Sequence, residues 1–303
     1  MKLLQLKTLI SRNCKLFFKD KGLFFPSLIA PLILLFLFIA FLGNVYRDSI
    51  RNVVEGYPIS NQLVESIAGG WLFSSLLAVC AVTIAFTANV IMVQDRVTGR
   101  RNDLTVAPVP PHILALSYFI STFLVTAVIS LSALAAGFVY LGVCGWHLSA
   151  WDVIGTILDA VLLILFGTAI SSIVCHFLKS QGGVTAVQAI VSSAYGFLCG
   201  AYMPLSQLAP WLKNILMFLP GTYGTGLLHS HLMGGAIEAI TGEGIPQELV
   251  TGLKDGYDCT LQFFGSAVPE WACYLVLVCA VLLFTGGYVL VCMRRHKPSR
   301  SKR

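Results

Sequence analysis

Residues 69–93 read GGWLFSSLLAVCAVTIAFTANVIMV and contain no Lys, Arg, Asp or Glu in 25 positions. A helix that crosses the hydrocarbon core of a membrane needs about 20 consecutive, mainly apolar residues. A charge inside such a helix is costly to bury in lipid, so charged residues are rare there. The stretch therefore predicts a membrane-spanning helix.

Apolar stretches of similar length recur on both sides of this one. They are residues 23–43, 113–143, 154–178, 184–203 and 271–293. In the whole chain 56% of residues are hydrophobic and 11% are charged, and the mean hydropathy is +0.81. These values are far from those of a soluble globular domain. We predict an all-α integral membrane protein whose six transmembrane helices form a single domain over residues 1–303.

The Lys and Arg residues between the predicted spans are distributed unequally between the two sides of the membrane. If the N-terminus lies inside, the inner segments hold 16 of the 20 Lys and Arg residues, and these segments are residues 1–22, 94–112, 179–183 and 294–303. Positively charged loops stay on the cytoplasmic side of a membrane. We therefore expect a multi-pass protein of the plasma membrane with both termini in the cytoplasm. The same clusters lie beside lipid headgroups, which accounts for the net charge of +6 without a nucleic-acid partner.

Residues 1–22 precede the first span and carry an amphipathic pattern. On a helical wheel Leu9 and Phe17 share one face, whereas Arg12 and Lys15 lie on the other. Helices of this kind lie in the headgroup plane of a membrane. The pattern predicts an N-terminal amphipathic interfacial helix; the alternative is a charged tail that only sets the topology.

An interrupted apolar stretch follows the fifth predicted span. Pro204, Pro210 and Pro220 cut it into pieces of ten residues or fewer, each shorter than the roughly 17 residues needed to cross a membrane. We therefore expect outer re-entrant helices that dip into the outer leaflet and return. The remainder of residues 204–270, from residue 234 onward, is acidic and predicts a solvated outer loop.

The inner loop at residues 94–112 begins QDRVTGRRNDLTVAPVPP. By charge alone it fits either an ordinary topogenic loop or a short element that a cytoplasmic partner grips as a lever. Its pattern resembles that of the type-2 ABC exporter permeases (ABC-2 family), in which an acidic-Arg pair is followed by Ser/Thr-Gly, Leu and Pro-Val. The matching positions are Asp95, Arg96, Thr98, Gly99, Leu104, Pro108 and Val109.

The resemblance implies that this loop couples the chain to a separate ATPase subunit by docking into a groove on it. Val97 and Asn102 depart from the pattern, because the family usually has Glu at both positions.

A second match to the same family lies in the outer stretch. Family members commonly show Gly, an aromatic residue and Pro, then a Leu-Pro-Trp-Leu run, then Leu-x-Pro and Tyr. The corresponding residues here include Gly200 and Tyr202, with an extra Ala209 inside the run. The remaining matches mark the outer re-entrant segment: Pro204, Pro210, Trp211, Pro220 and Tyr223. The resemblance covers nearly the whole chain and implies two permease chains, either identical or siblings, around one pathway.

The sequence has no G-x-x-x-x-G-K-[ST] motif and no segment large enough for a nucleotide-binding domain. The chain is therefore expected to be a transport subunit rather than an enzyme, without catalytic, cofactor or metal residues, and ATP and Mg are expected on the partner ATPase. Spans with few polar groups suit an amphiphilic or lipophilic cargo, such as a drug, a lipid-linked molecule or a peptide, so multidrug export fits. The alternative is an ion-coupled secondary transporter or a channel.

Asp159 is the only acidic residue inside a predicted span. Ionisable residues at membrane depth are functional by default. Asp159 lies near the outer end of its span, so it either reaches water there or contacts the transport pathway or the second permease chain.

Overall fold

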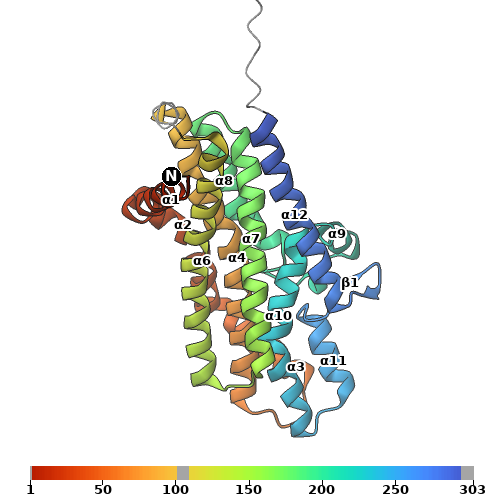
Figure 1. The fold of residues 1–303 in the computed structure, drawn as a ribbon. Coiled ribbons are helices and arrows are strands. Elements are labelled where there is room, and N and C mark those ends of the chain that lie inside the picture. The colour runs from red at the N-terminus through yellow and green to blue at the C-terminus, as the bar shows by residue number, and fades with distance from the viewer. Residues whose placement is uncertain (1, 101–108, 295–303) are drawn as a thin grey trace, which may run out of the picture.

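The computed structural model describes residues 2–100 and 109–294 and is a bundle of long helices (Figure 1). The longest helices are α4 (Asn61–Val97), α6 (Pro111–Cys144), α7 (Ala150–Phe177) and α12 (Glu270–Arg294). The others are α1 (Lys2–Lys19), α2 (Lys21–Leu37), η1 (Phe38–Leu42), α3 (Gly43–Val53), α8 (Gln181–Leu198), η2 (Leu205–Gln207), α9 (Pro210–Leu216), α10 (Pro220–Ala239), η3 (Ile240–Glu243) and α11 (Gln247–Gly256). One short antiparallel hairpin joins β1 (Gln262–Phe263) to β2 (Ser266–Ala267), with Gln262 opposite Ala267.

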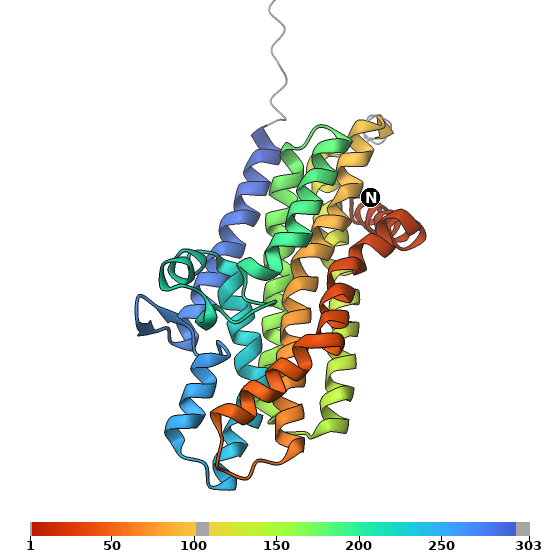
Figure 2. The same cartoon turned by 180° about the vertical axis from the view of Figure 1, so that it is seen from behind.

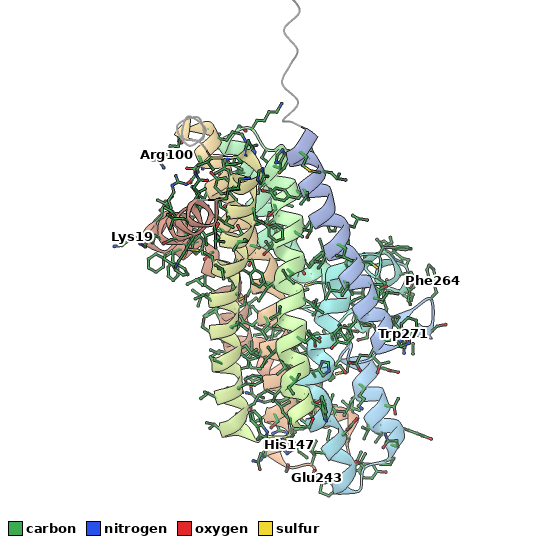
Figure 3. The ribbon with its side chains drawn as sticks, viewed as in Figure 1. Lys19, Arg100, His147, Glu243, Phe264 and Trp271 are labelled. Carbon is green, nitrogen blue, oxygen red and sulfur yellow. The ribbon has the colours of Figure 1, made fainter. Side chains whose placement is uncertain are left out.

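The bundle has two ends, which we name after residues that mark them. At the Arg96 end α4 and α12 end and α6 begins, whereas at the His147 end α6 ends and α7 begins (Figure 3). Charged pairs lie beyond the apolar part of the helices toward the His147 end. Arg47 of α3 lies 2.7 Å from Glu65 of α4, and Lys254 of α11 lies 2.6 Å from Glu238 of α10.

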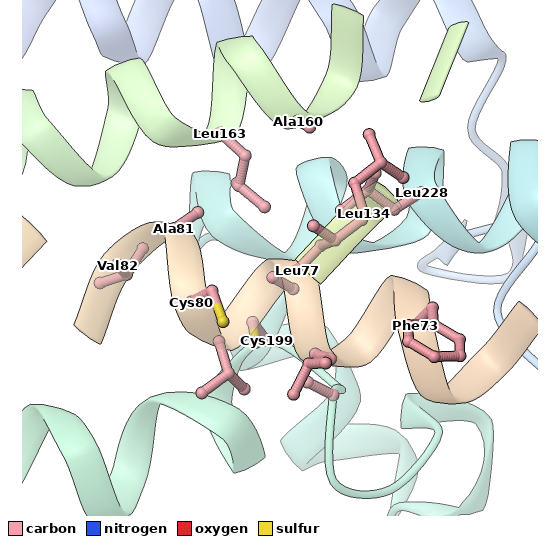
Figure 4. Close-up of a cluster of buried hydrophobic side chains, with 14 of the residues drawn as sticks. Phe73, Leu77, Cys80, Ala81, Val82, Leu134, Ala160, Leu163, Cys199 and Leu228 are labelled. Carbon is pink, nitrogen blue, oxygen red and sulfur yellow. The ribbon is translucent and has the colours of Figure 1, made fainter. Parts of the chain in front are cut away.

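Helix α4 is the centre of the bundle. Every residue from Ser66 to Val93 is buried, because α4 packs against α2, α6, α7, α8 and α10. Figure 4 shows Leu77 of α4 among side chains of the surrounding helices. Helix α7 comes close to α4 at Gly167, where a Cβ atom would lie 2.1 Å from the Ala81 carbonyl oxygen of α4. Small residues of this kind let two helix backbones come together without a side chain between them.

Helix α1 confirms the predicted N-terminal helix and its apolar face. It lies across the axis of the long helices near the Arg96 end (Figures 1 and 2). Leu9 and Phe17 are buried against the bundle, whereas Leu3 and Leu4 near its start are 79% and 71% exposed.

Five helical stretches among the described residues are long and apolar enough to cross a membrane. They contain the predicted spans 23–43, 69–93, 113–143, 154–178 except its last residue, and 271–293. The first is one continuous helix from Lys21 to Val53, in which α2, the π-helical turn η1 and α3 follow one another. The remaining predicted span, 184–203, corresponds to α8, which is 18 residues long but carries Gln188, Ser192 and Ser193. A sixth span therefore stays a prediction.

The stretch after α8 is broken at the predicted prolines. Pro210 and Pro220 are the first residues of α9 and α10, a position where the missing amide hydrogen of proline leaves no bond unmade. The expected loop after residue 234 is wrong, because α10 continues to Ala239 and α11 follows. The apolar positions Met233 and Ile237 keep the helical period, and burial of both against the bundle stabilises the helix.

Candidate functional site

Asp95, in the last turn of α4, joins three elements at the Arg96 end. Arg12 of α1 donates from Nη1 and Nη2 to the two carboxylate oxygens at 2.6 Å and 2.9 Å. Tyr118 of α6 donates its hydroxyl to Asp95 Oδ2 at 2.7 Å. The Asp95 side chain is 1% exposed, and its hydrogen bond raises the pKa of Arg12 above its ordinary value. A bidentate pair of this kind fixes the orientation as well as the distance of its partners.

Arg96, the next residue along α4, contacts a helix that the Asp95 side chain does not contact. Its Nη1 atom donates to the carbonyl oxygens of His176 at 2.8 Å and Leu178 at 2.6 Å. These carbonyls belong to the end of α7, where backbone acceptors lack partners within the helix and attract a cation. Asp95 and Arg96 together therefore tie the loop-bearing end of α4 to α1, α6 and α7. We call this arrangement the Asp95–Arg96 brace.

The helix ends directly after the brace. Thr98 is the C-cap of α4, and its hydroxyl donates to the Gln94 carbonyl at 2.8 Å. Gly99 has a φ of 79°, in the left-handed region that glycine adopts without strain at helix ends. Leu104 and Pro108, the other two predicted coupling residues, lie outside the described residues. The predicted start of the loop at residue 94 is therefore wrong, because α4 continues to Val97 and holds Asp95 and Arg96 in its last turn.

A cleft lies between the first span and α8. Its volume is about 550 Å³. Its polar lining comes from Tyr46, Ser49, Ser192, Ser193 and Gln207, and its apolar lining from Ile33, Leu37, Phe41, Leu42, Val45, Phe197, Tyr202 and Met203. None of these lining residues is charged. The π-helical turn η1 forms part of the wall, and such turns inside α-helices are frequent at functional sites. We call this space the α2–α8 cleft.

The residues predicted for the outer re-entrant segment do not form one site. Pro204 is the N-cap of η2, whereas Pro210 and Pro220 begin α9 and α10. Trp211 is 65% exposed on α9, and Tyr223 is buried in a small cluster with Leu205, Leu216, Met217, Leu227, Leu261 and Cys273. Helix α9 and the β1–β2 hairpin project together from one side of the bundle (Figures 1 and 2).

Asp258 holds the start of this segment in place. Its carboxylate accepts hydrogen bonds from the backbone amides of Leu205 and, at 3.1 Å, of Ser206. The Ser206 hydroxyl donates to the Gly256 carbonyl at 2.6 Å. Burial raises the pKa of Asp258 to about 6. Asp258 could not be predicted from the sequence, because its hydrogen-bond partners lie more than fifty positions earlier.

Asp159 is fully enclosed and has its partner within the same chain. His231 Nδ1 of α10 lies 2.7 Å from Asp159 Oδ2, and the Asp159 side chain is 0% exposed. On the other side of the ring, His231 Nε2 lies 3.5 Å from Glu270 Oε1 of α12. His229, two positions away, instead faces Ser75 of α4 at 3.3 Å. The pair therefore links α7 to α10, a role that the sequence did not indicate.

Comparison with known protein families finds a match for most of the chain. A family model described as ABC-2 type transporter matches residues 4–232, from α1 into α10. The match includes the Asp95–Arg96 brace and the α2–α8 cleft. No curated protein matches the chain significantly.

Proposed function

The chain belongs to the ABC-2 type transporter family, and we propose that it is the permease subunit of an ATP-driven exporter. The Asp95–Arg96 brace is the observation that supports this role best. The Asp95 and Arg96 side chains hold α1, α6 and α7 by direct hydrogen bonds. A displacement of the loop that follows them therefore moves these helices as well. A partner that pulls on the loop therefore shifts several helices at once, which is what a permease driven from outside requires.

The partner is an ABC ATPase subunit that binds ATP and Mg. The sequence of this chain carries no phosphate-binding loop motif of its own. The Arg96 end is the cytoplasmic end in this proposal, since the inner segments hold 16 of the 20 Lys and Arg residues. Both termini then lie in the cytoplasm, and the protein resides in the plasma membrane.

The cargo is amphiphilic or lipophilic and enters the α2–α8 cleft. Apolar side chains line most of the cleft, and its hydroxyl and amide groups offer hydrogen bonds without charge. Binding sites for small molecules have this composition, an apolar wall with a few polar groups that set the orientation. A drug, a lipid-linked molecule or a peptide with a neutral polar part fits the cleft better than an ion does.

A second permease chain completes the pathway. Helix α8 exposes Ile190 and Phe197, which are 64% and 58% exposed, beside the cleft. On α2 and η1, Phe36 and Ile39 are 68% and 73% exposed. A second copy or a sibling that covers these two helices would enclose the α2–α8 cleft between the chains.

Reconstitution of the chain with its ATPase in vesicles tests the proposal. We expect ATP-dependent export, and stimulation of ATP hydrolysis by amphiphilic cargo. Replacing Arg96 by Gln should reduce cargo-stimulated hydrolysis about tenfold while the two subunits still copurify. Lys21→Gln is the matched control, because Lys21 is an exposed cation at the start of α2. Transport driven by an ion gradient without nucleotide would contradict the proposal and favour a secondary transporter.

A further inference from the structure

A short segment directly after α11 contacts both walls of the α2–α8 cleft. One wall is the first span, which contributes Tyr46 and Ser49, and the other is α8 with the chain that follows it, which contributes Gln207. Helix α11 contacts both α3 and η2 and lies beside α3 in Figures 1 and 2. The two residues that follow α11 are Tyr257 and Asp258, and we call them the outer clamp.

Tyr257 holds the wall that the first span forms. Its hydroxyl donates to the Tyr46 carbonyl oxygen at 3.3 Å, and the two rings pack with 5.9 Å between their centroids. Both residues are 4% exposed, so water has little access to this contact. Because Tyr46 lines the cleft, a displacement of Tyr257 moves the wall directly.

Asp258 holds the opposite wall. Its carboxylate accepts hydrogen bonds from the backbone amides of Leu205 and Ser206, and the next residue, Gln207, lines the cleft. The Ser206 hydroxyl adds a third bond, at 2.6 Å to the Gly256 carbonyl. Hydrogen bonds from backbone amides to a carboxylate are charge-assisted and stronger than neutral ones. The segment after α11 therefore fixes the position of η2, at the end of this wall.

The backbone of Asp258 has an unusual conformation. Its φ is 55°, in the left-handed region that few residues other than glycine adopt. Such a conformation costs free energy and persists where the surrounding contacts hold it. The contacts that hold it here go to two different elements, since Tyr257 bonds to α3 and Asp258 bonds to η2.

We propose that Tyr257 and Asp258 are positioning residues that hold the two walls of the α2–α8 cleft together, and that the cleft opens toward the His147 end when the outer clamp releases. Both walls pack on α4, and the clamp adds a second link between them. In the orientation proposed above the His147 end faces the outside, so release of the clamp gives the cargo its exit. This exit rests on the proposed function, whereas the link between the walls does not.

The distance between the two walls tests the clamp. Spin labels carried by non-canonical amino acids at Val45 and Phe197 leave the native cysteines unchanged; both positions line the cleft, one on each wall, and are 43% and 58% exposed. The labelled full-length chain is diluted with unlabelled chain in vesicles without ATPase or nucleotide and measured by pulsed electron spin resonance at neutral pH. Tyr257→Phe and Asp258→Asn should each raise the population of longer distances about fivefold, because each loses hydrogen bonding to one wall.

Both substitutions keep the size of the side chain. Asparagine tolerates the left-handed conformation but offers one acceptor oxygen where the carboxylate offers two. Ser206→Ala removes only the bond to the Gly256 carbonyl, and it supplies a second test of the same wall if Asp258→Asn does not fold.

Two matched controls make the same chemical changes elsewhere at the His147 end. Tyr57→Phe removes the hydroxyl of a tyrosine that is 40% exposed in the loop after α3. Asp255→Asn changes an acid that accepts from Gln262 of β1 at 3.1 Å. Neither control should change the distances. A lower Tm of the Tyr257 and Asp258 variants with the distances of the parent would show a merely structural role and overturn the proposal.

This measurement is independent of the export assay, because no ATPase takes part in it. Longer distances in the clamp variants of a chain that shows no ATP-dependent export would support the clamp and contradict the proposed function. Unchanged distances in both clamp variants of a chain that exports cargo would overturn the clamp and leave the proposed function in place.

Discussion

Arg12 of α1 and Asp95 of α4 are 83 positions apart in the sequence, yet two hydrogen bonds of 2.6 Å and 2.9 Å join them. The pair places the N-terminal helix against the base of the loop at residues 94–112. Helix α1 continues almost directly into α2, so a displacement of the loop also reaches the first span and the α2–α8 cleft. The N-terminal helix is thus part of the proposed coupling path and does more than anchor the chain.

Replacing Arg12 by Gln should weaken both folding and coupling. The change leaves the buried Asp95 carboxylate with Tyr118 as the remaining partner of those described above. Removing the donors of a buried hydrogen-bonded carboxylate costs about 1–3 kcal/mol, and because Arg12 is 28% exposed water reduces the loss. We expect a lower Tm in detergent and a several-fold loss of cargo-stimulated ATP hydrolysis. Lys15→Gln on the exposed face of α1 should change neither, and equal behaviour of the two variants would contradict the role of the pair.

Replacing Gly167 by Ala should destabilise the centre of the bundle. The added Cβ would lie 2.1 Å from the Ala81 carbonyl oxygen, so α4 and α7 must move apart. Overpacking of this kind costs about 1–3 kcal/mol. The Tm in detergent should fall clearly. Gly142→Ala in α6 is the matched control, because nothing lies within 4 Å of its Cβ position and alanine is the better helix former; a fall in Tm for both variants would rule out the close contact as the cause.

The spans could be predicted because the run of apolar residues that marks each one lies within the span itself. The charge-free run at residues 69–93 lies within α4, and Pro210 and Pro220 begin helices where their chemistry favours it. The pattern of residues 94–99 predicts a coupling loop, but it does not predict the direction of the side chains. A pattern of Asp-Arg next to a loop does not say whether the two charges face a partner protein or, as here, the chain's own helices.

The long-range pairs could not be predicted, since each partner is ordinary in its own segment. His231 lies in a stretch with few charges and pairs with Asp159 from 72 positions away. Helix α8 shows the opposite difficulty. Its hydroxyl and amide groups reduce the apolar signal of a span, yet Gln188 donates to Thr87 of α4 at 3.0 Å, a contact that suits a helix inside a bundle.

The stability that Asp258 contributes should depend on pH. Its pKa is raised from 3.8 to about 6 in the folded chain, so the folded state binds a proton more tightly than the unfolded state does. The stabilisation from Asp258 is therefore complete below about pH 4 and is lost as the pH rises to about 6. At 1.36 kcal/mol per pKa unit, the loss is about 3 kcal/mol. The free energy of unfolding of the Asp258→Asn variant should not show this dependence on pH, because asparagine does not titrate. The Tm difference between the two proteins, measured from pH 4 to 7, should shift in favour of the variant as the pH rises, and a constant difference would contradict the assignment.

Replacing Asp159 by Asn tests whether the enclosed pair with His231 holds α10 to α7. Asparagine keeps the size of the side chain but removes the charge opposite the ring, whose other nitrogen lies 3.5 Å from Glu270. Loss of one partner from a buried pair is strongly destabilising, so α10 should separate from α7 more readily. A cysteine at Ser230, next to His231, should then react with a water-soluble maleimide several-fold faster than in the parent.

Replacing His231 by Gln should have the same effect, because it breaks the same contact from the other side. Asp152→Asn is the control on α7, since Asp152 caps the start of that helix through Ser149. Faster labelling in the Asp152 variant alone would show that the start of α7, rather than the Asp159–His231 pair, secures α10.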